Sequence, residues 1–326
     1  MKSLRNVNPK SFQEAARTLA ADPKAMAVGG GSDLLQLLKE HTIAPDTLVN
    51  LKAIGGQDKI ETHGNTLSIG ALATLDSISH HAEVRQKYAV LAEAAGQVAT
   101  PQIRNAGTIA GNVMQRPWCW YYRNNFPCYK NGGNTCFSIT GENDFHAIFG
   151  GGPSFIVHPS DTAPALVALG ARFKIQGANG TREVAAADFF QPPTVNPAKE
   201  NSLAAGEVLT EITIPAPAKG TRSTYLKILD REAWTHAVVG VAAVLEMDGA
   251  MCKSARVVLS GVAPIPWRVP AVEQILAGQR ITEDLLVRAG EKAVEGARPL
   301  AKNAYKVPLL RASVKQALRT ASGVSA

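Results

Sequence analysis

The sequence predicts an α+β protein with two domains, and three observations support that prediction. Helix-like and strand-like segments mix without an internal repeat over the first two thirds of the chain. Proline and glycine then interrupt the chain in residues 214–223, and strand-like runs followed by helix-like runs come after them. The 326 residues, of which 45% are hydrophobic, suffice for two cores. We therefore expect one domain over residues 1–219 and a small α+β domain over residues 220–326.

The first domain opens with a helix, a strand and a second helix. Ser11 and Glu14 form a capping box in front of an amphipathic stretch, which predicts a helix over residues 12–22. The apolar residues 26–28 predict a strand, and the pattern DLLQLLKE predicts a helix over residues 33–40. Between this strand and this helix stands a loop with three glycines, and the order is thus strand, loop, helix.

Further elements follow from alternation and from turn residues. Two hairpins are expected, one around Gly64-Asn65 and one around Asn179-Gly180, and one long helix over residues 75–96 lies between them. In the second domain, residues 223–263 predict three strands with a turn at Asp248-Gly249. Helices are expected after these strands, over the segments PAVEQILAG and TEDLLVRAGEKAVEGA.

Composition excludes several classes of protein. The net charge of +7 is spread along the chain and aromatic residues make up only 6%, so a nucleic-acid-binding surface is not indicated. No apolar run approaches the roughly 20 residues that a membrane-spanning helix needs. The N-terminus lacks the charged-then-apolar profile of a signal peptide, so we expect a cytoplasmic protein, with export beside a signal-bearing partner as the alternative.

Two glycine-containing loops are candidates for binding an anion. In the first loop (residues 29–32, GGGS), bare backbone N–H groups precede a helix, an arrangement that suits a phosphate. The loop matches neither the dinucleotide fingerprint nor the nucleoside-triphosphate loop, and a tight turn is the simpler interpretation. In the second loop (residues 106–112, AGTIAGN), Thr108, Gly111 and Asn112 offer a hydroxyl, bare backbone and an amide. Together the loops favour a ligand with two phosphates and a long polar body.

Four segments, in their order and spacing, carry a family resemblance over essentially the whole chain. AVGGGSDLLQLL, QIRNAGTIAGN, HPSDTAPAL and YLKILDRE resemble the FAD-binding medium subunit of the xanthine dehydrogenase and carbon monoxide dehydrogenase family of molybdenum hydroxylases. The resemblance implies a two-lobed FAD-binding domain of the p-cresol methylhydroxylase type. A small C-terminal α+β domain with a three-stranded sheet and helices should follow. FAD is the implied cofactor, with its pyrophosphate on the first loop.

The resemblance also implies roles for individual residues, each with a simpler alternative. Asp161 would bind FAD, but it also stands where a residue could cap a helix. Lys227 would lie near the isoalloxazine, where a cation favours reduced flavin, or it is a solvated strand lysine. Leu209 would pack on the flavin, or it is simply part of the core. The implied cofactor-binding set is Ala27, Val28, Gly29, Gly30, Gly31, Ser32, Asp33, Leu34, Thr108, Gly111, Asn112, Asp161, Leu209 and Lys227, and no acid–base catalytic residue is expected.

Three of the four cysteines, Cys119, Cys128 and Cys136, fall in one short segment, which in a cytosolic protein argues for metal binding. Three free buried thiols are the alternative. The segment resembles an insertion, about residues 114–155, by which 4-hydroxybenzoyl-CoA reductase and the periplasmic aldehyde oxidase hold an extra [4Fe-4S] cluster. Here Ser154 stands where those relatives have the fourth cysteine, and a serine oxygen is a poor iron–sulfur ligand. Cys252 is expected in the core.

The family places such a chain at the exit of an electron path. A large molybdopterin subunit hydroxylates the substrate, a small subunit carries two [2Fe-2S] clusters, and FAD passes electrons to ferredoxin, quinone, cytochrome or oxygen. The resemblance thus implies the flavoprotein component of a heterotrimeric aldehyde or xanthine dehydrogenase-like enzyme, whose substrate the absent large subunit decides. The alternatives are a stand-alone FAD oxidase of the p-cresol methylhydroxylase type and a FAD-storing or assembly protein without turnover.

Overall fold

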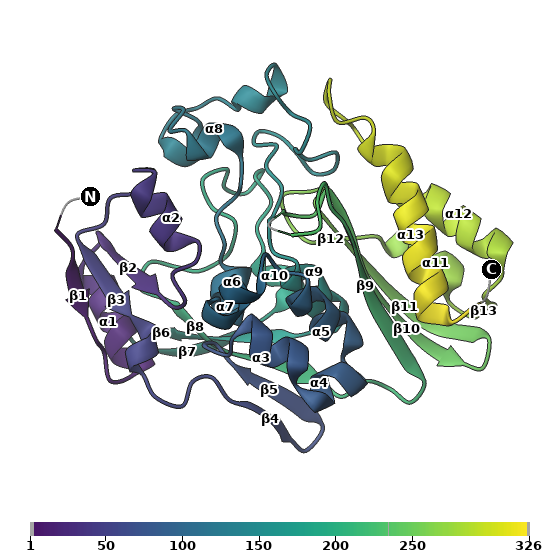
Figure 1. The fold of residues 1–326 in the computed structure, drawn as a ribbon, viewed down its shortest axis with the longest axis horizontal. Coiled ribbons are helices and arrows are strands. Elements are labelled where there is room, and N and C mark those ends of the chain that lie inside the picture. The colour runs from purple at the N-terminus through teal and green to yellow at the C-terminus, as the bar shows by residue number, and fades with distance from the viewer. Residues whose placement is uncertain (1–2, 234, 325–326) are drawn as a thin grey trace.

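The computed structural model describes residues 3–233 and 235–324, which form three sheets (Figure 1). A small sheet near the N-terminus and a larger sheet belong to the first part of the chain, and a third sheet with its helices is built from the last third. The segment that carries α8 lies above the junction of these parts. This mixed architecture confirms the predicted α+β class.

The first sheet contains three parallel strands in the order β1-β3-β2. Its first helix begins as its capping residues predict, because the Ser11 hydroxyl accepts a hydrogen bond from the Glu14 backbone N–H at 3.1 Å. The strand, loop and helix expected at the first loop are present. The elements of this region are β1 (Arg5–Val7), α1 (Phe12–Ala21), β2 (Ala25–Val28), α2 (Leu34–Lys39), β3 (Thr47–Asn50) and the 3₁₀ helix η1 (Leu51–Ala53).

The second sheet has five antiparallel strands in the order β4-β5-β8-β6-β7. Both predicted hairpins lie in it, and β8 joins them from a position more than 20 residues further along the chain. Alternating residues of β6 and β8 are buried, as expected for a sheet with one face on a core. The strands are β4 (Ile60–His63), β5 (Thr66–Gly70), β6 (Arg172–Gly177), β7 (Gly180–Ala185) and β8 (Val208–Pro215).

The long helix expected over residues 75–96 is wrong, because the chain breaks there into three short helices. His81 and Tyr88 stand at the breaks with non-helical backbone angles, φ −65° and ψ 123° at His81 and φ −128° and ψ 46° at Tyr88. The breaks let the helices fold over one hydrophobic core. The helices of this region are α3 (Leu75–His80), α4 (Ala82–Lys87), α5 (Ala89–Gly96), α6 (Pro101–Ala106), α7 (Ile109–Val113), α9 (Thr162–Ala168) and α10 (Ala186–Phe189).

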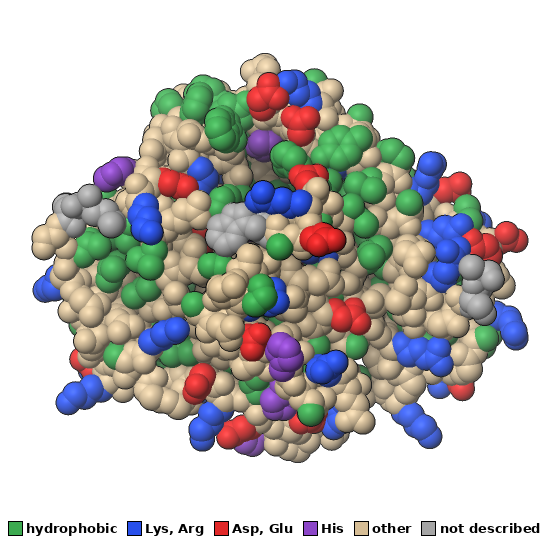
Figure 2. Space-filling model, viewed as in Figure 1, with side chains coloured by type: hydrophobic (Ala, Val, Ile, Leu, Met, Phe, Trp, Pro, Cys, Tyr) green, Lys and Arg blue, Asp and Glu red, His purple; other side chains and the backbone are tan. Residues whose placement is uncertain are grey.

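The cysteine-bearing segment is largely irregular and presents apolar side chains to solvent. Its regular elements are short: α8 (Trp120–Arg123), η2 (Tyr129–Asn131) and η3 (Phe137–Ile139). Figure 2 shows hydrophobic side chains gathered over this segment at the top of the molecule. Those exposed there are Trp118, Trp120, Phe126, Ile139 and Phe145.

The third sheet contains three long antiparallel strands, as predicted, and two additional strands of two residues each. Its helices include α13, which the sequence analysis omitted although Leu310, Val314 and Leu318 form a buried helical stripe. Within the described residues, no helix is both long and apolar enough to cross a membrane. The elements are β9 (Thr221–Ile228), β10 (Val239–Asp248), β11 (Met251–Ser260), β12 (Trp267–Arg268), α11 (Pro270–Leu276), β13 (Gln279–Arg280), α12 (Glu283–Ala293) and α13 (Lys306–Ser322).

Candidate functional site

The two glycine-containing loops pack backbone against backbone. A Cβ atom on Gly30 would lie 2.7 Å from the carbonyl carbon of Ala106 and 2.9 Å from the Cα of Gly107, distances that real side chains do not adopt. A Cβ atom on Gly29 would lie 2.9 Å from Oγ1 of Thr108. The first loop therefore needs glycine because the second loop approaches it so closely. The two candidate anion-binding segments form one structural unit.

The first loop forms one wall of a cavity of about 390 Å³. Residues 26–34 line one side, and the second loop contributes Thr108 and Gly111. Across the cavity lie residues of a segment that precedes β8, together with Leu209 at the start of that strand. The lining is mixed: glycine backbone and aliphatic side chains alternate with the polar groups of Arg116, Lys199, Glu200, Asn201 and Glu207.

A second cavity, of about 90 Å³, lies next to the first. Ser32 and Asp33 line both cavities, so the end of the first loop separates them. Apolar residues line much of this smaller cavity, and Asp161 and His236 stand in its wall. A ligand with a flat apolar end and a polar middle would fit across the two.

Asp161 and Lys227 form a buried ion pair at the smaller cavity. Lys227 Nζ lies 2.7 Å from Asp161 Oδ2, and the two side chains are only 1% and 4% exposed, respectively. The Tyr225 hydroxyl donates to Asp161 Oδ1 at 2.8 Å, and Lys227 also donates to the carbonyl of Gln97 at 2.9 Å. Burial raises the pKa of Tyr225 well above 10, and the Asp161 charge adds to this, so the hydroxyl stays protonated.

Both simpler interpretations of this pair fail. Asp161 stands just before α9, but its side chain makes no capping hydrogen bond. Lys227 lies on β9 and is buried rather than solvated. A buried carboxylate and a buried ammonium need each other, because either charge alone would be costly to keep from water. Because Asp161 lines the smaller cavity, the Asp161–Lys227 pair is positioned to interact with a ligand bound there.

Thr108 and Asn112 serve mainly to hold the second loop. The Thr108 hydroxyl accepts from the Gly111 backbone N–H at 3.2 Å and thereby caps α7. The Asn112 Oδ1 accepts from Ser160 and Thr162 at 2.6 Å each, which fixes the turn that carries Asp161. Among the described residues the buried Asn112 Nδ2 has no partner, so one donor is left for a ligand or a water.

Asp33 ties the first loop to the cysteine-bearing segment. Its Oδ1 accepts from the Arg123 guanidinium at 2.6 Å, and its Oδ2 accepts from the Arg116 backbone N–H at 3.0 Å. The Arg123 guanidinium also lies over the Trp118 ring, 4.4 Å from its centroid. Asp33 therefore lies beside the proposed ligand but is already engaged by two donors.

Leu209 and Lys227, which the resemblance places at one flavin, lie at different cavities. Leu209 lines the larger cavity, with the first loop, whereas Lys227 bonds to Asp161 at the smaller one. Ser32 and Asp33, at the end of the first loop, line both cavities and so lie between them.

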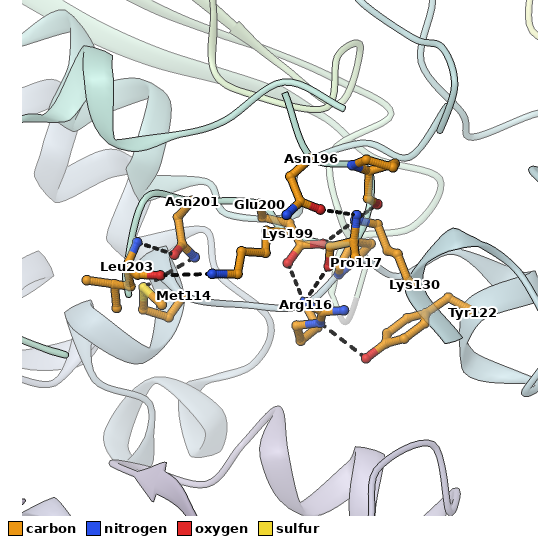
Figure 3. Close-up of polar contacts among 12 residues, drawn as sticks. Met114, Arg116, Pro117, Tyr122, Lys130, Asn196, Lys199, Glu200, Asn201 and Leu203 are labelled. Carbon is orange, nitrogen blue, oxygen red and sulfur yellow. Dashed lines mark hydrogen bonds and ion pairs between the residues drawn. The ribbon is translucent and has the colours of Figure 1, made fainter. Parts of the chain in front are cut away.

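A charged cluster around Glu200, which the sequence analysis missed, stands at the larger cavity (Figure 3). The Glu200 carboxylate accepts from the guanidinium of Arg116 at 2.7 Å and from the ammonium of Lys130. Burial lowers the pKa of Lys130, while the Glu200 charge opposes that change. No pattern in the sequence signals this cluster, since its members are 70 and 84 residues apart.

Cys119, Cys128, Cys136 and Ser154 line one cavity of about 10 Å³. The Cys119 sulfur lies 3.4 Å from His146 Nε2, and burial raises the pKa of Cys119 to about 11. Within the described residues, no group of three or more His, Cys, Asp or Glu side chains could hold a metal ion. The donors for a cluster share one cavity, but that cavity has room for little more than one water. The present geometry therefore does not fit the expected [4Fe-4S] cluster. Cys252 is buried in the third sheet, as expected.

Both parts of the chain match known protein families. Residues 2–217 match the FAD binding domain in molybdopterin dehydrogenase. Residues 224–321 match the CO dehydrogenase flavoprotein C-terminal domain. These matches support FAD as the cofactor of the first part.

Several known proteins are similar to the chain over nearly its full length. The aldehyde oxidoreductase FAD-binding subunit PaoB of Escherichia coli K12 is 36% identical over 94% of this chain and 95% of that protein. The carbon monoxide dehydrogenase medium chain of Hydrogenophaga pseudoflava is 30% identical over 96% and 95%. Among solved structures, carbon monoxide dehydrogenase of that organism superimposes with a TM-score of 0.79 at 27% identity, covering 99% of this chain and 98% of the other. Quinoline 2-oxidoreductase of Pseudomonas putida 86 gives 0.79 at 26% identity, covering 99% of each.

The close packing of the loops predicts that Gly30→Ala loses bound flavin. The added methyl group meets the backbone of the second loop, and a strain of about 1–3 kcal/mol would lower FAD affinity by about fivefold to a hundredfold. Gly55→Ala is the matched control, because no atom lies within 4 Å of a Cβ there and its φ is not positive. Flavin absorbance per protein after purification is the measurement. Equal flavin content in both variants would contradict the loop packing.

Proposed function

Because this chain belongs to the family of FAD-binding subunits of molybdenum hydroxylases, we propose that it is the electron-exit subunit of such an enzyme. It would carry FAD and pass electrons from the [2Fe-2S] clusters of a partner to an external acceptor. The observation that carries this proposal is the pair of adjoining cavities, which meet at the first loop and end at a buried ion pair. We also propose that the FAD-binding domain ends near residue 219.

The proposed arrangement of FAD follows from the two cavities. Bound FAD would supply the redox chemistry, accepting electrons from the partner and releasing them to the acceptor. The backbone of residues 27–34 and of the second loop would receive the pyrophosphate, as its amide groups suit an anion. The isoalloxazine would lie in the smaller cavity, beside Asp161 and Lys227. The adenosine would lie in the larger cavity, near Leu209.

The chain's own residues bind and tune rather than transfer protons. The Lys227 ammonium would stand near the flavin and favour added negative charge there. Asp161 keeps that ammonium in place and balances its charge. The Tyr225 hydroxyl donates to the same carboxylate and so orients it. None of these groups needs to change protonation state, in agreement with a subunit that has no acid–base step of its own.

The names of the relatives support a multi-subunit enzyme. One is called a FAD-binding subunit, and others are called medium chains of carbon monoxide or glyceraldehyde dehydrogenase. We propose that this chain likewise joins a small [2Fe-2S] subunit and a large molybdopterin subunit. Among the possible substrates we favour an aldehyde, because the relative that is 36% identical is the FAD-binding subunit of an aldehyde oxidoreductase. We propose a cytoplasmic enzyme, with export beside a partner as the alternative, and ferredoxin, quinone, cytochrome or oxygen as the acceptor.

Two rival functions have less support. A stand-alone oxidase of the p-cresol methylhydroxylase type needs a substrate pocket in its second domain, whereas two cavities of about 390 Å³ each are lined by residues of the first domain. A FAD-storing protein would have no reason to place a buried lysine–aspartate pair beside the cofactor. The full-length similarity to enzyme subunits favours electron transfer over both.

A [4Fe-4S] cluster on Cys119, Cys128 and Cys136 remains a separate proposal. The donor set supports it, because three thiols and the Ser154 hydroxyl face one cavity. The volume of that cavity opposes it, so a cluster would require the walls to move apart. No electron step of the proposal depends on this cluster.

Purification from the native cells provides the test of the proposed function. A tagged chain should copurify with two partner chains, and the complex should contain molybdenum, FAD and [2Fe-2S] clusters. Its FAD should be reduced when the complex meets its substrate without oxygen. A stable monomer that oxidises an organic substrate by itself would contradict the proposal and support the oxidase.

Substitution of Lys227 tests the placement of the flavin. Lys227→Gln leaves the buried Asp161 carboxylate unbalanced beside the ring, which should lower the two-electron potential of FAD by about 30 mV or more, a factor of ten in the equilibrium constant. The double variant Asp161→Asn/Lys227→Gln is neutral again and should recover most of the loss. Potentiometric titration of the bound flavin is the measurement. An unchanged potential in Lys227→Gln would place the flavin elsewhere.

Iron analysis separates the two interpretations of the cysteines. A cluster predicts about four irons per chain beyond those of the small subunit. Ser154→Cys, which supplies a fourth thiolate, should then make this iron more resistant to air. Anaerobically purified protein without this iron, in which all four thiols react once the chain is unfolded, would instead establish free thiols.

A further inference from the structure

The segment of residues 196–203 forms the wall of the larger cavity opposite the first loop. Lys199, Glu200, Asn201 and Leu203 all line the cavity from this segment. Its backbone is irregular and is held near its end: the Glu200 carbonyl accepts from the Gln191 N–H, the Ser202 N–H donates to the Phe189 carbonyl, and the Arg182 guanidinium of β7 donates to the Ser202 carbonyl at 3.0 Å. A wall of this kind needs other interactions to stay in place.

Two cations from the cysteine-bearing segment supply those interactions (Figure 3). Arg116 donates to the Ala198 carbonyl at 3.3 Å and to Glu200 Oε2 at 2.7 Å. Lys130 donates to the Pro197 carbonyl at 3.1 Å and to Glu200 Oε1. The Glu200 side chain is thus held at both carboxylate oxygens, and the same two cations hold the backbone before it.

Because these charged groups are buried, the loss of any one partner would be costly. The side chains of Glu200 and Lys130 are 3% and 2% exposed, so water cannot replace a lost partner. Without the Glu200 charge, two buried or half-buried cations would face each other across the segment. We expect such repulsion to displace the wall rather than leave it in position.

Arg116 joins this wall to the opposite one. Its backbone N–H donates to Asp33 at the end of the first loop, while its guanidinium binds Glu200 and the Tyr122 hydroxyl. Arg116 and its two carboxylate partners thus connect the two walls of the larger cavity, in addition to the hydrogen bonds that hold Ser202 to Phe189 and Arg182. We expect a change at Glu200 to alter the spacing of the walls more than the first loop, because Asp33 at the end of that loop is also held by Arg123.

We propose that Glu200 is a positioning residue, which fixes the wall of the adenosine side of the cofactor site and so makes the chain select FAD over FMN. The inference rests on the proposed function, in which the adenosine takes the larger cavity and the flavin takes the smaller one. FMN has a flavin and one phosphate but no adenosine. Its affinity should therefore depend on the first loop and the smaller cavity and not on Glu200.

The test is a titration of the flavin-free full-length chain with FAD and with FMN, followed by flavin fluorescence. Glu200→Gln keeps the shape of the side chain but removes its charge. Its FAD affinity should fall about tenfold or more, the loss typical of a charge-assisted hydrogen bond, while its FMN affinity should change less than about twofold. Glu183→Gln is the matched control, because Glu183 forms an exposed ion pair with Arg172 on the β6–β7 hairpin.

Lys130 variants distinguish positioning from direct contact with the nucleotide. If Glu200 acts through its place in the cluster, Lys130→Met should reduce FAD affinity as Glu200→Gln does, and Lys130→Arg, which retains the cation, should restore it. If Glu200 touched the ribose instead, Lys130→Met would bind FAD normally, and that result would overturn the proposal. A variant that loses affinity for FAD and FMN equally would show a general loss of structure and would also overturn it.

The wild-type chain separates this inference from the proposed function. Failure of the wild-type chain to bind FAD would contradict the proposed function. Tight FAD binding by the wild-type chain with unchanged FAD affinity in Glu200→Gln would contradict only the role of Glu200.

Discussion

The close approach of two backbone segments is the constraint on which the site depends. Gly30 allows the first loop to rest on the backbone of Ala106 and Gly107, and Gly29 lies against the Thr108 side chain, where no larger residue fits. This packing joins the loop after β2 to the segment between α6 and α7 and leaves the residues of the first loop in the wall of a cavity. The same loop then separates the larger cavity from the smaller one. Both halves of the proposed FAD site thus depend on one contact.

Buried carboxylates complete the site by joining segments that are distant in sequence. The half-buried Asp33 pairs with Arg123, the buried Glu200 pairs with Arg116 and Lys130, and the buried Asp161 pairs with Lys227 of the third sheet. Buried ion pairs of this kind contribute little net stability, because desolvation offsets their attraction. They do restrict how the segments can lie, since any other arrangement leaves a charge unpaired. The pairs therefore define the shape of the cavities more than the stability of the fold.

Local patterns predicted much of the architecture, and long-range contacts explain what they missed. The Ser11 cap, both hairpins and the first loop depend on neighbouring residues and were predicted correctly. The stripe of apolar residues in α13 was available in the sequence and was overlooked. The breaks in residues 75–96 and the Glu200 cluster could not be predicted locally, because tertiary packing produces the first and contacts across at least 70 residues produce the second.

The measurement that most directly tests the account is a crystal structure of the purified chain with FAD. We expect the pyrophosphate on the amide groups of the first loop, the isoalloxazine beside the Asp161–Lys227 pair and the adenosine in the larger cavity with Leu209. Electron density for FAD with the isoalloxazine in the larger cavity, or with the pyrophosphate away from Gly29 and Gly30, would contradict it.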